Sequence, residues 1–203
     1  AKPKFREILS KSRAINVLSA ARMFLFGARD VWFVVALPVY LHTVFGWDFW
    51  KVGGFMATWV IGYGFIQTLA PRITGNMEGR QPAMIWAAAL ALIPAGIAVG
   101  LMVGWSPQFV VIGGLLLFGV LFAINSSLHS YLIVSYARGD GVSLDVGFYY
   151  MSNAAGRLLG TILSGWVYQA YGLQACLWIS AGLVAAAAIL SMFLPEKRPV
   201  PAT

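Results

Sequence analysis

Three arginines and one aspartate lie inside long apolar stretches of this sequence. Arg22, Arg29 and Asp30 interrupt the first stretch, and Arg157 interrupts the fifth. An ionised side chain at mid-bilayer costs between about 2.5 and more than 10 kcal/mol, so these groups must face protein or a water-filled cavity if the stretches span a membrane. Three guanidinium groups against one carboxylate leave an excess of positive charge, and arginine presents a planar fork that suits phosphate-like oxyanions. The pattern predicts a site for an anionic ligand.

These charged groups are expected at similar depths in a membrane. Counted outward from the inner boundary at about 1.5 Å per residue, Arg22 lies about 12 Å deep, and Arg29 and Asp30 lie about 23 Å deep. Arg157 lies about 22 Å deep by the same rise. Arg22, Phe26 and Arg29 recur at helical spacing and share one face. If Asp30 pairs with Arg157 as a structural buttress, Arg22 and Arg29 remain without an obvious carboxylate.

Two further stretches carry polar side chains at overlapping depth. In "INSSLHSY", Asn125 and His129 are four residues apart and share a face, within about a turn of the depth of the first arginine. Tyr149 and Asn153 precede Arg157 at intervals of four residues in the fifth stretch. His129 is either a hydrogen-bonded packing residue or a substrate contact or proton site.

The elements that must position these residues are membrane spans. The chain has 203 residues, of which 60% are hydrophobic and 10% charged, whereas soluble domains carry about 25% charged residues. The net charge of +7 lies mostly in short segments between apolar runs, which indicates membrane orientation rather than a nucleic-acid partner. Six runs can each cross about 30 Å of hydrocarbon. The predicted fold class is therefore an all-α membrane protein with six transmembrane helices, at about 14–45, 49–71, 83–104, 107–136, 142–171 and 174–194.

Basic residues concentrate on one side of these spans, which is typical of the cytoplasmic side. Ten lie on that side and only Lys51 on the other, so both ends of the chain are expected in the cytoplasm. Residues 1–13 would form an amphipathic linker, 14–194 the bundle and 195–203 a tail. The basic start has no signal-peptide pattern, and we expect the chain to begin partway through a longer protein. The ten residues are Lys2, Lys4, Arg6, Lys11, Arg13, Arg72, Arg80, Arg138, Lys197 and Arg198.

Neither a metal centre nor a redox centre is expected. Cys176 is the only cysteine, so the chain has no internal disulfide, CxxC pair or cysteine cluster. His42 and His129 are expected at opposite membrane depths and cannot share a metal. We therefore predict no cofactor and no metal site.

Small and turn-forming residues indicate how the spans pack. Gly156 and Gly160 form a GxxxG motif extended by Ser164, which indicates either close helix packing or surfaces that slide during a transport cycle. Pro38 is expected to bend the first span, and Asp48 to cap the second. The first and the fourth span each carry a row of polar side chains on one face. This is the pattern of a three-plus-three inverted repeat, whose binding site lies near mid-membrane.

Several segments resemble a known family of carriers. The order of polar and apolar spans resembles the C-terminal half of a major facilitator superfamily carrier, whose first, fourth and fifth helices line the cavity. "PRITGNMEGR" keeps the Gly79-Arg80 pair of a family loop but lacks its usual aspartate. "WVIGYGFIQTLAPRITG" and "FAINSSLHSYLIVSYARGDGVSLDVGFYYMSNAAGRLLGTILSGWVYQ" look like the organoarsenical efflux permeases of the superfamily. The resemblance implies a multi-pass plasma (inner) membrane protein that lacks its N-terminal six-helix half.

The resemblance also implies a cargo. Those permeases export an arsenylated phosphoglycerate made by a glyceraldehyde-3-phosphate dehydrogenase acting on arsenate, so the resemblance implies a functional link to such a dehydrogenase. This cargo is multiply anionic, which suits arginines with hydrogen-bonding neighbours. A single cysteine argues against a thiol site for trivalent arsenic. The candidate substrate-binding residues are Arg22, Arg29, Arg157, Asn125, Ser126, His129, Tyr149 and Asn153.

Two other functions remain open, namely an exporter of another anionic metabolite or drug and an intramembrane hydrolase. Rhomboid-type proteases need a GxSG motif, but Ser164-Gly165 is preceded by "IL". Ser126 and His129 share one helical turn without an obvious oxyanion hole. We therefore predict no catalytic residue, and a transporter rather than an enzyme.

Energy coupling through proton exchange would need a titrating group. Asp30, Asp145 and His129 are the candidates. A carboxylate paired with arginine keeps its charge, so such pairing would make Asp30 the weakest of the three.

Overall fold

The computed structural model describes residues 10, 12–74, 79–137 and 142–196, and all regular structure within these ranges is α-helical. The predicted all-α fold class is confirmed. Most of the basic residues used above for orientation lie outside the described residues, as do residues 1–9 and 11 of the predicted linker and 197–203 of the predicted tail. The helices are α1 (Arg13–Phe33), α2 (Ala36–Thr43), α3 (Phe49–Thr74), α4 (Arg80–Met102), α5 (Pro107–Tyr136) and α6 (Val142–Ser191).

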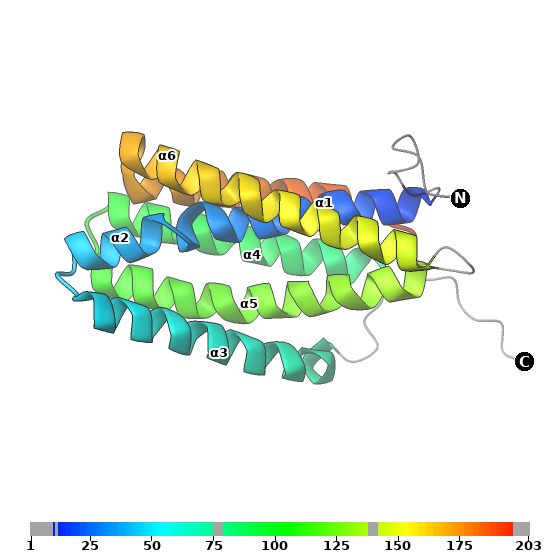
Figure 1. The fold of residues 1–203 in the computed structure, drawn as a ribbon, viewed down its shortest axis with the longest axis horizontal. Coiled ribbons are helices and arrows are strands. Elements are labelled where there is room, and N and C mark those ends of the chain that lie inside the picture. Colours follow the sequence, from blue (N-terminus) through cyan, green and yellow to red (C-terminus); the bar gives the residue numbers. More distant parts are fainter. Residues whose placement is uncertain (1–9, 11, 75–78, 138–141, 197–203) are drawn as a thin grey trace, which may run out of the picture.

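Helix α6 covers two of the predicted spans. It runs for 50 residues, and Gly172 (φ 76°, ψ −175°) interrupts its helical backbone. A straight helix of that length would be about 75 Å long, more than twice the hydrocarbon thickness of a bilayer. Figure 1 shows the yellow part running along the bundle and the orange part returning beside α1. Five helical segments within the described residues are long and apolar enough to cross a membrane, with α6 counted once.

The first predicted span consists of two helices, α1 and α2. The break falls just before Pro38, which has no N–H to donate to the carbonyl of Val34 and whose ring crowds that carbonyl. At this break the backbone N–H of Ala36 donates to the Ser164 hydroxyl of α6, at 3.1 Å, and not to a carbonyl of the preceding helical turn. The predicted bend at Pro38 is confirmed, and a side chain from a neighbouring helix stabilises it.

Helix α1 is the most deeply placed helix and packs mainly against α6. Their backbones meet at glycines: a Cβ atom on Gly160 would lie 2.6 Å from the carbonyl oxygen of Gly27. Gly156 lies against Met23 in the same way. The GxxxG motif therefore packs α6 against α1. Helix α3, by contrast, lies at the edge against α5, with most of its surface exposed (Figure 1).

Contacts at one end of the bundle join segments that are distant in sequence. The Ser10 hydroxyl donates to Asp145 at the start of α6, at 2.6 Å. The hydroxyl of Tyr136, at the end of α5, donates to the Pro195 carbonyl at 3.4 Å, and Arg80, at the start of α4, pairs with Glu196. The start of α1 and the residues that follow α6 therefore lie at the same end of the bundle, as expected for an even number of antiparallel spans. At the start of α3, the Asp48 carboxylate accepts from the N–H of Lys51 at 2.7 Å, which confirms the predicted cap.

Candidate functional site

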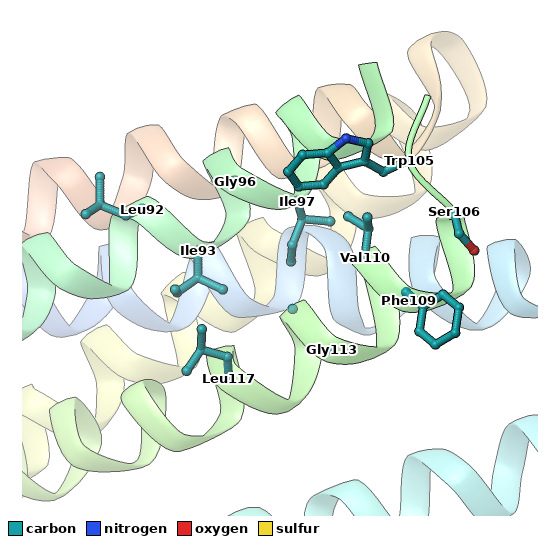
Figure 2. A pocket seen from close by; sticks show the side chains of 11 residues that line it. Leu92, Ile93, Gly96, Ile97, Trp105, Ser106, Phe109, Val110, Gly113 and Leu117 are labelled. Atoms are coloured by element: carbon teal, nitrogen blue, oxygen red, sulfur yellow. The ribbon is translucent and has the colours of Figure 1, made fainter. Parts of the chain in front are cut away.

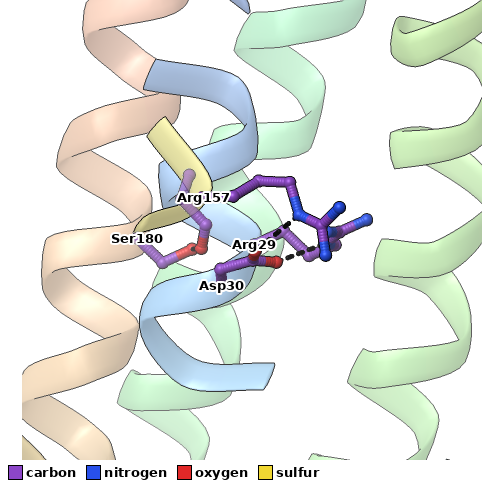
Figure 3. Close-up of polar contacts among 5 residues, drawn as sticks. Arg29, Asp30, Arg157 and Ser180 are labelled. Atoms are coloured by element: carbon purple, nitrogen blue, oxygen red, sulfur yellow. Dashed lines mark hydrogen bonds and ion pairs between the residues drawn. The ribbon is translucent and has the colours of Figure 1, made fainter. Parts of the chain in front are cut away.

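Asp30 joins two of the three membrane arginines. Its Oδ1 lies 2.6 Å from Nε of Arg29, and its Oδ2 lies 3.2 Å from Nε of Arg157. Figure 3 shows the arginines of α1 and α6 reaching the same carboxylate. The Asp30 side chain is 1% exposed and that of Arg157 is 55% exposed. The predicted Asp30–Arg157 pair is present, and Arg29 shares the same carboxylate.

This arrangement leaves part of each guanidinium group free. Both arginines use Nε for the aspartate, and their terminal amino groups make no hydrogen bond within the described ranges. Two positive charges share one negative charge, so this cluster carries a net positive charge. The free amino groups can bind an oxyanion without breaking the pairs to Asp30.

Arg22 is buried without any carboxylate partner among the residues that the structure describes. Its Nη1 donates to the backbone oxygen of Ser126 at 3.0 Å and to the Ser126 hydroxyl at 3.1 Å. Nε2 of Gln67 lies 3.3 Å from the same hydroxyl. Ser126 therefore connects α1, α3 and α5, and Gln67 is a polar neighbour that the sequence did not single out as part of the site.

Aromatic rings surround the two arginines of α1. Cζ of Arg22 lies 4.0 Å from the ring centroid of Phe26 and 5.1 Å from that of Tyr149. Cζ of Arg29 lies 4.9 Å from the Phe26 centroid and 5.4 Å from that of Phe122. The helical spacing placed Phe26 on the arginine face, but residue type alone did not indicate its contact with both guanidinium groups.

His129, Tyr149 and Asn153 lie on the α5 and α6 sides of this region. His129 and Tyr149 are fully buried. Neither ring nitrogen of His129 has a hydrogen-bond partner in the described part of the chain, and the same holds for Oδ1 of Asn153. His129 is one turn beyond Ser126, the contact of Arg22. His129 therefore retains hydrogen-bonding capacity beside the buried Arg22, and Asn153 retains it one turn before Arg157 on α6.

Two predicted residues are directed elsewhere. Nδ2 of Asn125 donates to the backbone oxygens of Trp86 in α4 and Leu121 in α5, each at 2.9 Å. This amide is directed toward α4, whereas its neighbour Ser126 contacts Arg22. Asp145 lies in the first turn of α6, next to Ser10, rather than among the arginines.

A separate apolar groove lies between α4 and α5. It has a volume of about 600 Å³, and Figure 2 shows its lining side chains converging from both helices. Trp105 and Ser106 lie at the turn that joins the helices, and Ile93, Ile97 and Leu117 lie further along. No charged residue lines the groove. Its chemistry suits hydrocarbon rather than an anion.

Within the described ranges, no three or more His, Cys, Asp or Glu side chains lie close enough together to hold a metal ion.

The chain is similar to a known protein family: the model of the Major Facilitator Superfamily matches residues 23–203. No curated protein matches the sequence. The match includes Arg29, Asp30 and all of α6, and it begins one residue after Arg22.

Proposed function

Since this chain belongs to the major facilitator superfamily, we propose that it forms half of an efflux permease for an organic, phosphate-like anion. Members of the family are secondary transporters rather than enzymes, and they bind small-molecule substrates within the membrane. With its long apolar helices, the chain is part of a multi-pass membrane protein. The anionic cargo, the direction of transport and the coupling ion belong to the proposal.

The observation that carries the proposal is the surplus of arginine over aspartate in the middle of the spans. Asp30 offsets one of the charges of Arg29 and Arg157, and Arg22 has only neutral contacts in the described part of the chain. A fixed charge of this kind is expensive in a membrane unless a ligand or water meets it. A cargo with several anionic oxygens meets this requirement.

We assign the substrate site to two groups of residues. Arg29 and Arg157 present free amino groups, and Arg22 lies about two turns closer to the start of α1. Ser126, His129 and Tyr149 lie around Arg22, and Asn153 lies between Tyr149 and Arg157 on α6; these side chains can bond the remaining polar atoms of the cargo. Asn125 is a weaker candidate for cargo binding, because its amide nitrogen already donates to two backbone carbonyl groups.

The specific cargo that we propose is an arsenylated phosphoglycerate, which would confer resistance to arsenate. Pentavalent arsenic mimics phosphate and needs guanidinium groups rather than thiolates, and the single cysteine is buried beside α6 residues. The proposal includes a functional link to a glyceraldehyde-3-phosphate dehydrogenase. It also includes a second six-helix bundle that completes the cavity, an inner-membrane location and cytoplasmic chain ends.

Coupling to protons would use His129 in this proposal. Asp30 is held between two guanidinium groups, and Asp145 lies at the end of the bundle near Ser10. His129, one turn from the Arg22 contact Ser126, is the remaining candidate, and neither of its ring nitrogens has a hydrogen-bond partner among the described residues. Exchange of a proton for the anion would make the protein an antiporter.

Uptake into inside-out vesicles that contain the complete carrier tests the proposal. The vesicles receive radiolabelled arsenate, glyceraldehyde 3-phosphate, NAD⁺ and the dehydrogenase, so that the labelled ester forms outside them. We expect uptake that requires the dehydrogenase and falls at least tenfold in Arg29→Ala and Arg22→Ala at equal membrane abundance. Unchanged uptake in both variants would remove these arginines from the site.

Matched probes separate the arsenical from other anions. Labelled 3-phosphoglycerate and glycerol 3-phosphate are offered without arsenate. Uptake of these two compounds but not of the arsenical would support an exporter of organic phosphates and contradict a role in arsenate resistance. Uptake of none of the three would reject the proposal.

A further inference from the structure

Phe26 occupies an unusual position between the two arginines of α1. One ring contacts both guanidinium groups, with centroid-to-Cζ distances of 4.0 Å to Arg22 and 4.9 Å to Arg29. The ring is buried and packs edge-on against Phe122, with centroids 5.1 Å apart. Arg22 and Arg29 are seven residues apart, so a straight helix separates their Cα atoms by about 10 Å.

The ring of Phe26 lies next to two like charges. Because both Cζ atoms lie within 4.9 Å of one centroid, the ring is a contact that the two guanidinium groups share. The face of an aromatic ring is negative and attracts cations most strongly where water is excluded. A ring offsets part of each charge without neutralising it, whereas a carboxylate in the same place would compete with an anionic cargo.

We propose that Phe26 is a positioning residue that makes Arg22 and Arg29 act as a pair toward a cargo with two anionic groups. This inference rests on the proposed function, since it concerns the same site. It adds a specificity: a molecule with two anionic groups gains from the pair, and a molecule with one anionic group uses a single arginine. Loss of the ring therefore weakens binding of the first class more than binding of the second.

Binding of two probes to the detergent-solubilised complete carrier tests this inference. 3-Phosphoglycerate carries a phosphate and a carboxylate, and glycerol 3-phosphate carries the phosphate alone. The Kd of each is measured from ligand-dependent thermal stabilisation. In Phe26→Leu we expect the Kd for 3-phosphoglycerate to rise about tenfold and that for glycerol 3-phosphate about twofold or less. Phe26→Tyr, which keeps the ring, should restore the ratio of the two values.

Phe118→Leu is the matched control. Phe118 is fully buried and stacks on Phe122 with centroids 5.5 Å apart, but within the described residues it contacts neither arginine. We expect this variant to lose stability with no change in the ratio of the two Kd values. Should Phe26→Leu fail to fold, Phe26→Met removes the ring while it keeps a long apolar side chain.

The outcomes distinguish this inference from the proposed function. If the unmodified carrier binds neither probe, the proposed organic-phosphate site is wrong. If the unmodified carrier binds both and the Phe26 variants change the two Kd values equally, or no more than Phe118→Leu does, Phe26 is a packing residue and the inference is overturned.

Discussion

Gly156 of α6 lies directly against the backbone of Met23 in α1. A Cβ atom at Gly156 would overlap the carbonyl group of Met23, and no flexible side chain is there to move aside. The next residue, Arg157, reaches Asp30 of α1 from this contact. The close approach of the two backbones therefore sets the position of the arginine that α6 contributes to the candidate site.

Gly156→Ala should separate α1 from α6. Overpacking of a well-packed contact costs about 1–3 kcal/mol, and a clash with backbone lies at the upper end of that range. We expect a lower melting temperature in detergent together with weaker binding of 3-phosphoglycerate. Gly165→Ala is the control, because nothing lies within 4 Å of a Cβ atom there. Equal melting temperatures for the two variants would show that the helices tolerate separation at Gly156.

Asp30→Asn should destabilise the carrier, because it leaves two guanidinium groups facing one another. Removing one partner from a buried ion pair costs about 3–5 kcal/mol. The double variant Asp30→Asn/Arg157→Gln lacks one of the two uncompensated charges. We therefore expect its melting temperature to be higher than that of Asp30→Asn. Residues in direct contact typically show coupling energies of about 0.5–3 kcal/mol in such a cycle. Strictly additive melting shifts would mean that Asp30 and Arg157 do not interact.

Ser164→Ala should weaken the break between α1 and α2. The change removes the acceptor of the Ala36 N–H, and an unsatisfied buried donor costs about 1–3 kcal/mol. In a Pro38→Ala background the helix can continue and the N–H regains a backbone acceptor, so the penalty should shrink. The control is Ser191→Ala, since among the described residues the buried Ser191 hydroxyl bonds only the Ala187 carbonyl of its own helix. Thermal unfolding of the unmodified carrier, the two single variants, the double variant and the control measures the difference, and an equal penalty in both backgrounds would contradict the coupling.

The sequence predicted the helical class because the spans are long and uniformly apolar, a pattern that depends only on local composition. It also predicted that Asp30 could pair with Arg157, since depth along a helix follows from residue count. The sharing of Asp30 by Arg29 was not predicted. Arg29 and Asp30 are adjacent residues of α1, which do not normally face each other on a helix, so that contact depends on the side-chain rotamers of the two residues and does not follow from residue counting.

Side-chain direction was equally hard to predict for neighbouring polar residues. Asn125 and Ser126 are adjacent, yet the first bonds α4 and the second bonds Arg22. A step of one residue turns a side chain by about 100° around a helix, so membership of a polar stripe requires knowledge of which helices flank it. The same limit concealed Phe26, whose role depends on two contacts rather than on its residue type.

The orientation of the bundle is tested by labelling at the two ends of α3. In a Cys176→Ala background, Lys51→Cys should react with a membrane-impermeant maleimide in intact cells, and Arg72→Cys should react only after the membrane is opened. Both native side chains are exposed in the structure, so accessibility within the protein is matched. Helix α3 has 26 residues and is about 39 Å long, so its ends lie on opposite sides of the hydrocarbon core. Labelling of Arg72→Cys but not of Lys51→Cys in intact cells would mean that the bundle has the opposite orientation. Both ends of this chain would then lie outside the cytoplasm, since an even number of crossings keeps them on one side.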